Sequence, residues 1–394
     1  MMELETEQKL PQPAEGLRPL ALLPMRGCEE MGRMVNEYLL RWTVSPESEK
    51  LFTFPGEGKN SFLIEADCPR FGTGEAKGMI HQSVRGYDLF ILCDITNYHV
   101  TFPMYNLQCP MSPDDHFQDL KRLIAAAGNK PHRITVMMPY LYEGRQHRRS
   151  SRESLDCAMA LQELYALGVH NIITFDAHDP RVVNAAPVAN FDNVQPTYQM
   201  LKALLKCRPD LQIDKQHSMV ISPDEGAAAR NIYYSSMMGL DMGLFYKRRD
   251  YSCVINGRNP IVAHEYLGDD VEGKDVIIAE DILASGESLL DIATELRRRK
   301  ARRVFPCVSF TLFTEGVAAY QKAYDEGLFD LLLGTNLVHL DPELKQKPWF
   351  CEVDMSKYIA LLIATLNHDS SISGLLDPHE RIERLLEKHR AKQA

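Results

Sequence analysis

Short apolar segments alternate with amphipathic segments along most of this chain. The apolar segments predict β-strands at residues 87–93, 133–138, 171–175, 218–222, 242–246, 275–279 and 303–310. Helical patterns lie between several of them, as at residues 154–167 and 197–205. This alternation predicts an α/β fold in which each mainly parallel sheet is flanked by helices. The Pro- and Asn-rich stretch 182–196 is interpreted as a crossover between two such halves.

The length and composition narrow the class of protein. A chain of 394 residues suggests two domains, and 45% apolar with 25% charged residues indicates a soluble globular protein with an ample core. The net charge of −10 argues against a broad nucleic-acid-binding surface. No apolar run is long enough to span a bilayer, and the acidic, Pro-containing start resembles neither a secretory nor a mitochondrial targeting segment.

The cysteines point to a reducing compartment. All nine are scattered, and none forms a Cys-x-x-Cys pair. We therefore expect reduced thiols in a cytoplasmic protein, with neither a zinc site nor a disulfide framework.

The segment 275–288 carries the most specific chemical signal. Its apolar run ends in Glu280 and Asp281, and a Ser-Gly step at Ser285 and Gly286 then leads into a helical run. Backbone N–H groups at a helix N-terminus bind phosphate, and carboxylates accept hydrogen bonds from vicinal hydroxyls or hold a metal. The pattern therefore predicts a site for a phosphorylated sugar. The alternative is an ordinary strand-turn-helix in which Ser285 and Ser288 cap the helix.

Further polar clusters follow other predicted strands, at the edge where open α/β sheets bind ligands. They are Arg145, Gln146, Arg148, Arg149 and Arg152; Asp176 and His178; Asp224, Gly226 and Arg230; and Lys247, Arg248 and Arg249. The guanidinium groups suit phosphate, the histidine suits a cation or a phosphate oxygen, and Asp224 suits a metal–phosphate complex. A cationic loop beginning at Lys247 would close over transferring phosphates.

Each cluster also has a structural explanation. The arginines and the Lys247 loop fit solvated surface, His178 fits a polar strand end, and Asp224 fits a helix N-cap. The basic run at residues 297–303 is interpreted as cations at a helix C-terminus.

The order and spacing of these segments resemble the ribose-phosphate diphosphokinase (PRPP synthetase) family. PRFGTGE at 69–75, followed by HQSVRGYDLFIL, is similar to that family's adenine segment. GRQHRR, DAHDP and SPDEGAAAR are similar to its ATP loop, its Asp-Leu-His segment and its Ser-Pro-Asp segment. The start of its flexible loop and its ribose-phosphate loop correspond to KRR and VEGKDVIIAEDILASGES.

The resemblance implies an enzyme that transfers the diphosphoryl group of ATP to the 1-hydroxyl of ribose 5-phosphate, giving PRPP and AMP. It implies two phosphoribosyltransferase-type domains: an ATP-site domain at 18–188, onto which 341–380 packs back, and a ribose 5-phosphate domain at 189–340. It also implies Mg²⁺ and a dimer-based homo-oligomer, such as a hexamer, whose active site lies between the two domains.

The site residues follow from the same resemblance. Lys247 and Arg249 would be catalytic. The ATP contacts would be Phe71, Glu75, Arg145 and Gln146. Ribose 5-phosphate would bind to Glu280, Asp281, Ser285, Gly286 and Ser288. His178 and Asp224 would contact the metal.

The chain departs from the family pattern at several of these places. The departures are Thr73, His147, Ala227, Ala284 and Glu287, with an aromatic-rich insertion at 97–111. Thr73, His147, Ala284 and Glu287 are the main support for a rival hypothesis, a catalytically weak or inactive regulatory homologue. A phosphoribosyltransferase is the other rival, but it leaves the ATP-like segments and the KRR loop unexplained. Because Lys247, Arg249, His178, Asp224 and the acid pair are retained, an active enzyme is favoured.

Overall fold

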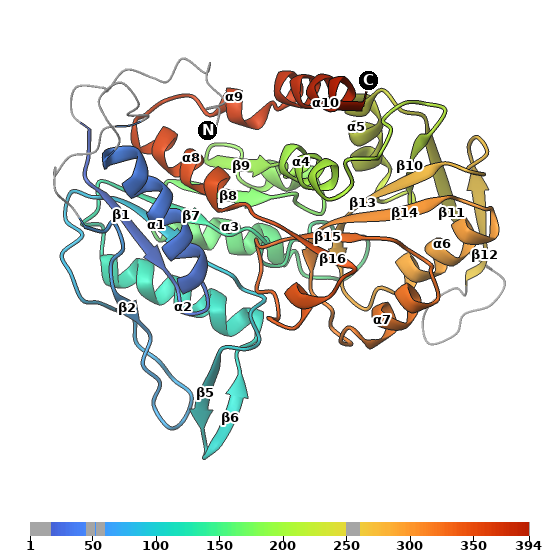
Figure 1. Cartoon of the computed structure of the whole chain (residues 1–394). Coiled ribbons are helices and arrows are strands. Elements are labelled where there is room, and N and C mark those ends of the chain that lie inside the picture. Colours follow the sequence, from blue (N-terminus) through green and yellow to red (C-terminus); the bar gives the residue numbers. More distant parts are fainter. Residues whose placement is uncertain (1–16, 45–51, 53–59, 250–260, 394) are drawn as a thin grey trace. The chain divides into compact units, whose positions relative to one another are not determined.

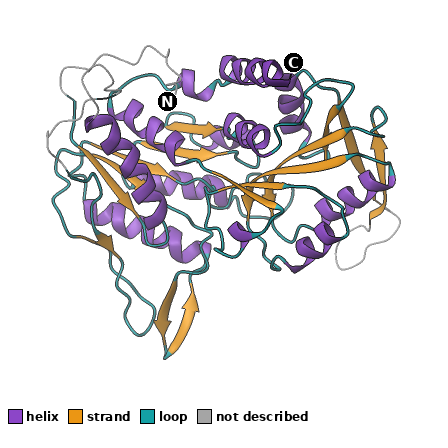
Figure 2. Ribbon diagram, in the orientation of Figure 1, coloured by secondary structure: helices purple, strands orange, loops and turns teal. Residues whose placement is uncertain are grey.

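The computed structural model describes residues 17–44, 52, 60–249 and 261–393, which form two compact units. Unit 1 lies within Met1–Val194 and Met355–Asp377, and unit 2 lies within Gln195–Asp354 and Pro378–Ala394. Figure 2 shows the main strands of each unit gathered into one sheet with helices packed around it. Within the described part of the chain, no helix has both the length and the apolar character needed to cross a membrane.

The described residues of unit 1 build a five-stranded parallel sheet in the order β1-β4-β7-β8-β9 (Figure 1). Its strands are Leu20–Pro24 (β1), Asp88–Leu92 (β4), Arg133–Met137 (β7), Asn171–Phe175 (β8) and Asn190–Val194 (β9). Its helices are Glu29–Val44 (α1), Pro113–Ala127 (α2), Asp156–Ala166 (α3), Ser356–Asn367 (α8) and Ser373–Leu376 (α9), with a 3₁₀ turn at Pro180–Ala185 (η1). Strands β4 and β8 are buried along their whole length, as expected for a parallel sheet covered on both faces.

Two short antiparallel pairs complete unit 1: Ala66–Asp67 (β2) with Met79–Ile80 (β3), and Thr101–Met104 (β5) with Leu107–Pro110 (β6). The β5–β6 hairpin is formed by the aromatic-rich insertion and projects away from the parallel sheet (Figure 1). Tyr105 and Asn106 turn it with φ of 47° and 61°, the left-handed pair that a two-residue hairpin requires.

Unit 2 has, among its described residues, a seven-stranded sheet in the order β12-β11-β10-β13-β14-β15-β16. Its strands are Ser218–Ser222 (β10), Met242–Arg249 (β11), Ile261–Leu267 (β12), Asp275–Leu283 (β13), Arg303–Thr311 (β14), Leu332–Thr335 (β15) and Phe350–Val353 (β16). Its helices are Thr197–Cys207 (α4), Ala228–Met238 (α5), Glu287–Arg298 (α6), Ala318–Asp325 (α7) and His379–Gln393 (α10), with a 3₁₀ turn at Leu344–Gln346 (η2). Only the β11–β12 pair in this sheet is antiparallel.

A buried Asp–Arg pair fixes the amino end of the sheet in unit 1. Asp88 and Arg133 begin adjacent strands and are register partners. Arg133 Nε donates to Asp88 Oδ1 at 3.0 Å and its Nη2 donates to Oδ2 at 2.6 Å, while Asn367 Nδ2 donates to Asp88 Oδ2 at 3.1 Å. The fully buried carboxylate thus joins β4, β7 and the end of α8.

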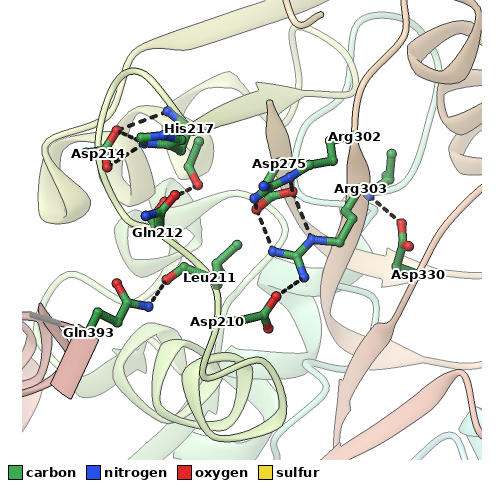
Figure 3. Close-up of polar contacts among 12 residues, drawn as sticks. Asp210, Leu211, Gln212, Asp214, His217, Asp275, Arg302, Arg303, Asp330 and Gln393 are labelled. Atoms are coloured by element: carbon green, nitrogen blue, oxygen red, sulfur yellow. Dashed lines mark hydrogen bonds and ion pairs between the residues drawn. The ribbon is translucent and has the colours of Figure 1, made fainter. Parts of the chain in front are cut away.

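Unit 2 has a similar Asp–Arg pair at the amino end of its sheet. Asp275 and Arg303 begin β13 and β14 and are register partners. Arg303 donates to both oxygens of Asp275 at 2.9 and 2.7 Å, and Arg302 also binds the carboxylate (Figure 3). Arg303 Nη1 binds Asp210 as well, at 2.5 Å. A carboxylate with no exposed surface is tolerable here because two guanidinium groups satisfy it.

The predicted α/β class is confirmed, and every predicted strand is present. Strand β13 runs on to Leu283 instead of ending at residue 279, because β14 continues to pair with it as far as Thr311. The stretch 182–196 contains both β9 and the crossing from Val194 to Gln195. Of the basic run, Arg297 and Arg298 do lie in the last turn of α6, whereas Arg302 and Arg303 lie beyond it and bind Asp275.

Candidate active site

Two acids on β13 face one cation in unit 2. Arg230 Nη1, from α5, lies 4.0 Å from Glu280 Oε1 and 3.6 Å from Asp281 Oδ1. The backbone N–H of Asp281 donates to Glu280 Oε1 at 3.3 Å. The sequence pattern pointed to both acids, and it placed Arg230 at a helix start without indicating that it would lie beside them.

The surroundings of Glu280 raise its pKa well above the usual value for a carboxyl group. Burial is the largest cause, followed by the hydrogen bond and the negative charge of Asp281, and Arg230 offsets these only in part. Asp224 contributes a further negative charge. A partly buried acid in this state is stabilised by any ligand that donates hydrogen bonds or brings positive charge.

The loop after β13 has a conformation that only glycine suits. Gly286, at φ 80°, is the N-cap of α6, and its carbonyl accepts hydrogen bonds from the N–H groups of Leu289 and Leu290 and from Tyr320 Oη. A Cβ added at this position would lie 1.8 Å from Tyr320 Oη. Since Gly286 is the N-cap, Ser285 and Ser288 do not occupy the capping position that the structural alternative assigned to them.

Asp224 follows β10, the neighbour of β13. Its Oδ1 accepts the N–H of Ala227 at 3.1 Å, and its carbonyl accepts Ser222 Oγ at 2.8 Å. The carboxylate therefore stabilises the turn before α5, but the N-cap of α5 is Ala227 itself. Asp224 is therefore not the N-cap of α5; its side chain accepts a hydrogen bond within the turn that precedes the helix.

Lys247 and Arg249 lie at the end of β11, on the other side of β10. The structure describes their backbone, with Lys247 opposite His264 of β12, and leaves their side chains outside the description. The rest of the predicted cationic loop, residues 250–260, also lies outside the described residues. Because β11, β10 and β13 are parallel neighbours, the two cations, Asp224 and the acid pair all lie toward the same edge of the sheet.

In unit 1 the loops after β7 and β8 meet through a contact between a histidine and an aspartate. His147 Nε2 lies 3.0 Å from Asp179 Oδ2, and the rings of His147 and His178 are 5.7 Å apart between centroids. Hydrogen bonds from Arg181 are the main reason that the pKa of Asp179 falls to about 2. Among the described residues, His147 Nδ1 is a buried nitrogen without a hydrogen-bond partner. His178 itself is exposed.

The neighbouring backbone is strained. Asp176 is the first residue after β8 and has φ 39°. This left-handed conformation is costly for residues other than glycine and often occurs at functional sites. The segment is held in place by the N–H of Ala177, which donates to Asn193 Oδ1 at 2.9 Å.

Arg145 and Gln146 differ in their environment. The Arg145 side chain is exposed, as are Arg148, Arg149 and Arg152. Gln146 Nε2 donates to the carbonyl of Ser154 at 2.9 Å, so the side-chain amide links two residues of the same loop. A contact from Gln146 to a ligand would therefore use its side-chain oxygen or follow a rearrangement.

Phe71 and Glu75 are brought together by a tight turn. The Phe71 N–H donates to the Glu75 carbonyl at 2.7 Å, and Thr73 Oγ1 donates to Glu75 Oε2 at 3.1 Å. The Phe71 ring is 57% exposed, so a planar ligand has access to it. The N–H of Tyr105, at the tip of the β5–β6 hairpin, donates to the Gly72 carbonyl at 3.0 Å and supports the turn.

The chain is similar to known proteins in both of its units. Residues 20–168 match the N-terminal domain of ribose phosphate pyrophosphokinase, and residues 189–346 match the phosphoribosyl transferase domain. The ribose-phosphate pyrophosphokinase of Pasteurella multocida is 28% identical over 316 residues, covering 79% of this chain and 91% of the relative. The one from Vibrio cholerae is 27% identical over 326 residues, covering 80% and 92%.

The fold is also similar to a solved structure. The phosphoribosylpyrophosphate synthetase of Mycobacterium smegmatis superposes with a TM-score of 0.70 at 17% identity, covering 90% of this chain and all of that one. The fold and the domain matches define a protein with two phosphoribosyltransferase-type domains. The chain belongs to the ribose-phosphate pyrophosphokinase family, the diphosphokinase family that its motifs resembled.

Proposed function

We propose that the protein is a ribose-phosphate diphosphokinase: it transfers the diphosphoryl group of ATP to the 1-hydroxyl of ribose 5-phosphate, giving PRPP and AMP. The observation that carries this proposal is the Glu280–Asp281–Arg230 cluster, which directly precedes the Gly286 loop at a helix N-terminus. Hydroxyl-binding acids next to a phosphate-binding loop suit a sugar phosphate.

Unit 2 is assigned the sugar phosphate. Glu280 and Asp281 would accept hydrogen bonds from the ribose hydroxyls. The N–H groups of residues 285–288 would bind the 5′-phosphate, with help from the hydroxyls of Ser285 and Ser288. The raised pKa of Glu280 supports this assignment, because a partly buried acid gains from the hydrogen-bond donors that the ligand would bring. Glu287 is exposed at the first turn of α6, so its charge can remain in solvent when phosphate binds.

Unit 1 is assigned the nucleotide. Phe71 would stack on adenine and Glu75 would bind its polar edge, while Arg145 and Gln146 would contact the rest of the nucleotide. The exposed ring of Phe71 and the exposed guanidinium of Arg145 support this assignment.

Catalysis would rest on positioning and charge. The anomeric hydroxyl attacks the β-phosphorus and AMP leaves, a displacement that needs little covalent help from the protein. Lys247 and Arg249 would bind the transferring group and stabilise negative charge on the bridging oxygen.

Mg²⁺, when bound, would neutralise phosphate oxygens, and His178 and Asp224 would contact it directly or through water. Within the described residues, no three His, Cys, Asp or Glu side chains converge to hold a metal alone. That fits an ion which takes most of its ligands from phosphates and water. A homo-oligomeric assembly and a cytoplasmic location are further parts of the proposal.

The test is product formation by purified protein with ATP, Mg²⁺ and ribose 5-phosphate, beside a Lys247→Ala variant. The proposal predicts PRPP and AMP in step, with turnover of the variant reduced at least about 100-fold and ribose 5-phosphate affinity little changed. Equal loss of turnover and affinity would contradict the role of Lys247. Folded protein that binds ATP and never turns over would instead support the regulatory homologue.

A further inference from the structure

Two cysteines that are far apart in the sequence lie in contact within unit 2. Cys207 is the last residue of α4 and Cys351 lies in β16, and their sulfur atoms are 2.8 Å apart. Helix α4 packs directly against β15 and β16, so regular secondary structure holds both backbones. Both thiols are partly exposed, which leaves them open to a reagent in solution.

We propose that Cys207 and Cys351 are a redox modification site, in which the two thiols are converted reversibly into a disulfide bond. A disulfide has its sulfurs about 2.05 Å apart. Closing the remaining distance takes less than about 1 Å of movement, which side-chain rotation can supply. Among the described cysteines, this is the one pair whose sulfurs make a hydrogen-bonding contact.

The other described cysteines are poor competitors. Cys28, Cys93, Cys157 and Cys307 are buried, so a reagent in solution cannot reach them in the folded protein. Cys68 and Cys109 are partly exposed, but the structure shows neither in contact with a second sulfur.

We assign the first attack to Cys207. Burial, and then the neighbouring Cys207, raise the pKa of Cys351 to about 12, so the Cys351 thiol is a poor first nucleophile. The oxidant is a low-molecular-weight disulfide. The Cys207 thiolate attacks one of its sulfurs and releases one thiol, and a mixed disulfide remains on Cys207.

Cys351 then loses its proton to water and attacks Cys207 Sγ, which releases the second thiol. Overall, two protein thiols and one small disulfide give one protein disulfide and two small thiols. A reducing dithiol reverses the change.

The bond would tie together two segments at the limits of unit 2. Helix α4 is the first element after the chain enters the unit at Gln195, and β16 ends one residue before Asp354, where the chain leaves it. The cross-linked residues are 144 positions apart, so the disulfide closes a long loop and restricts the unfolded chain strongly. This inference is independent of the proposed reaction, because none of the residues assigned to substrates takes part.

The experiment uses full-length protein equilibrated in glutathione buffers from reducing to oxidising, quenched with iodoacetamide and mapped by mass spectrometry without reduction. We expect a peptide containing the Cys207–Cys351 bond, loss of two free thiols, reversal by dithiothreitol, and a melting temperature about 5–15 °C higher in the oxidised form.

Variants separate this pair from the other thiols. Cys207→Ser and Cys351→Ser should each abolish the cross-link and the shift in melting temperature, while Cys109→Ser, at another partly exposed thiol, should leave both unchanged. A bond from either cysteine to any other thiol, including Cys253 outside the described residues, would overturn the proposal. So would oxidised wild-type protein that carries only glutathione adducts.

Discussion

His147 Nε2 lies 3.0 Å from Asp179 Oδ2, which joins the loop after β7 to the loop after β8. The resembling family has an acid at the position of His147. In this chain an acid on the neighbouring loop, Asp179, contacts His147, so a carboxylate still lies next to this position.

The His147–Asp179 pair gives the first prediction. Asp179→Asn should raise KM for ATP about 10-fold and change KM for ribose 5-phosphate much less, because the pair holds only the proposed nucleotide loops. Because the pKa of Asp179 is lowered to about 2, mainly by Arg181, the Asp179 carboxylate is charged at the pH of the assay. Steady-state kinetics in both substrates measures this.

A matched control comes from a similar pair at the surface. Asp214 Oδ1 lies 2.8 Å from His217 Nδ1 in unit 2, and both side chains are exposed. Asp214→Asn should leave both KM values unchanged. If it changed KM for ATP as much as Asp179→Asn, the specific role of the His147 pair would be wrong.

The second prediction concerns Gly286. Gly286→Ala should lower kcat/KM for ribose 5-phosphate at least about 100-fold, because the added methyl would collide with Tyr320 Oη and displace the N–H groups proposed to bind phosphate. The control is Gly239→Ala, which has a similar φ of 67° and no atom within 4 Å of the added Cβ. That variant should show near-normal kinetics and a stability loss of about 1–2 kcal/mol. Normal kinetics for Gly286→Ala would contradict the phosphate assignment.

The third prediction concerns the raised pKa of Glu280. Because its folded pKa lies above the unfolded value near 4.5, Glu280 contributes stability that is fully present below that pH and is lost as pH rises through the folded pKa. Glu280→Gln mimics the protonated form, so it should be more stable than wild type at pH 8 and nearly equal to it at pH 4.5. Turnover should fall at the same time, because the hydroxyl-binding carboxylate is lost.

Urea unfolding of ligand-free protein at the two pH values measures the effect. Exposed Glu343, changed to Gln, serves as the control and should show no pH-dependent difference from wild type. A Glu280→Gln variant that is less stable than wild type at both pH values would contradict the raised pKa assigned to Glu280.

The fourth prediction tests the buried cluster of Asp275 with Arg302 and Arg303 in unit 2, called the unit 2 clamp below. Asp275→Ala should lower the free energy of unfolding by about 3–5 kcal/mol, because it leaves Arg302 and Arg303 without their shared carboxylate. Asp210→Ala removes an exposed partner of the same Arg303 and should cost about 1 kcal/mol or less. Equal losses from the two variants would contradict the special role of the buried acid.

The pH dependence of this clamp has the opposite sign to that of Glu280. Burial on its own would raise the pKa of Asp275, but the hydrogen bonds from Arg303 and Arg302 outweigh it and the pKa is lowered. The stability from Asp275 is therefore fully present above the ordinary carboxyl pKa and is lost as pH falls through the lowered value. Acid unfolding of Asp275→Ala should accordingly be less steep than that of wild type.

Hydrophobic patterning and strand-end chemistry could predict the α/β class and the position of the acid pair. Strands such as β4 and β13 are strongly apolar, and residues after a strand end share one edge of the sheet. The prediction left out five strands of the two main sheets: β1, β9, β12, β15 and β16. Of these, β9 has the sequence NFDNV, which is polar at three positions. That strand exists because it pairs with β8, which is a tertiary effect.

The sequence could not predict the contacts between distant residues. Asp88 and its partner Arg133 are 45 residues apart in the sequence, and Gly286 and its partner Tyr320 are 34 residues apart. Neither pair has a local signature, since a strand-initial Asp or a Tyr in a helix is common for other reasons. Arg230 and Asp179 were visible as charged residues near strand ends, but their partners became evident only from the packing of α5 and the β8 loop.

The most direct test of the central claim is ³¹P NMR of wild-type protein with ATP, Mg²⁺ and ribose 5-phosphate. The account predicts that the three ATP signals decay together while AMP and the 1-diphosphate of PRPP appear in equal amounts. ADP with a ribose bisphosphate would contradict it by placing the attack at the γ-phosphorus. An unchanged spectrum from folded, ATP-binding protein would contradict it by showing that this chain does not catalyse the transfer.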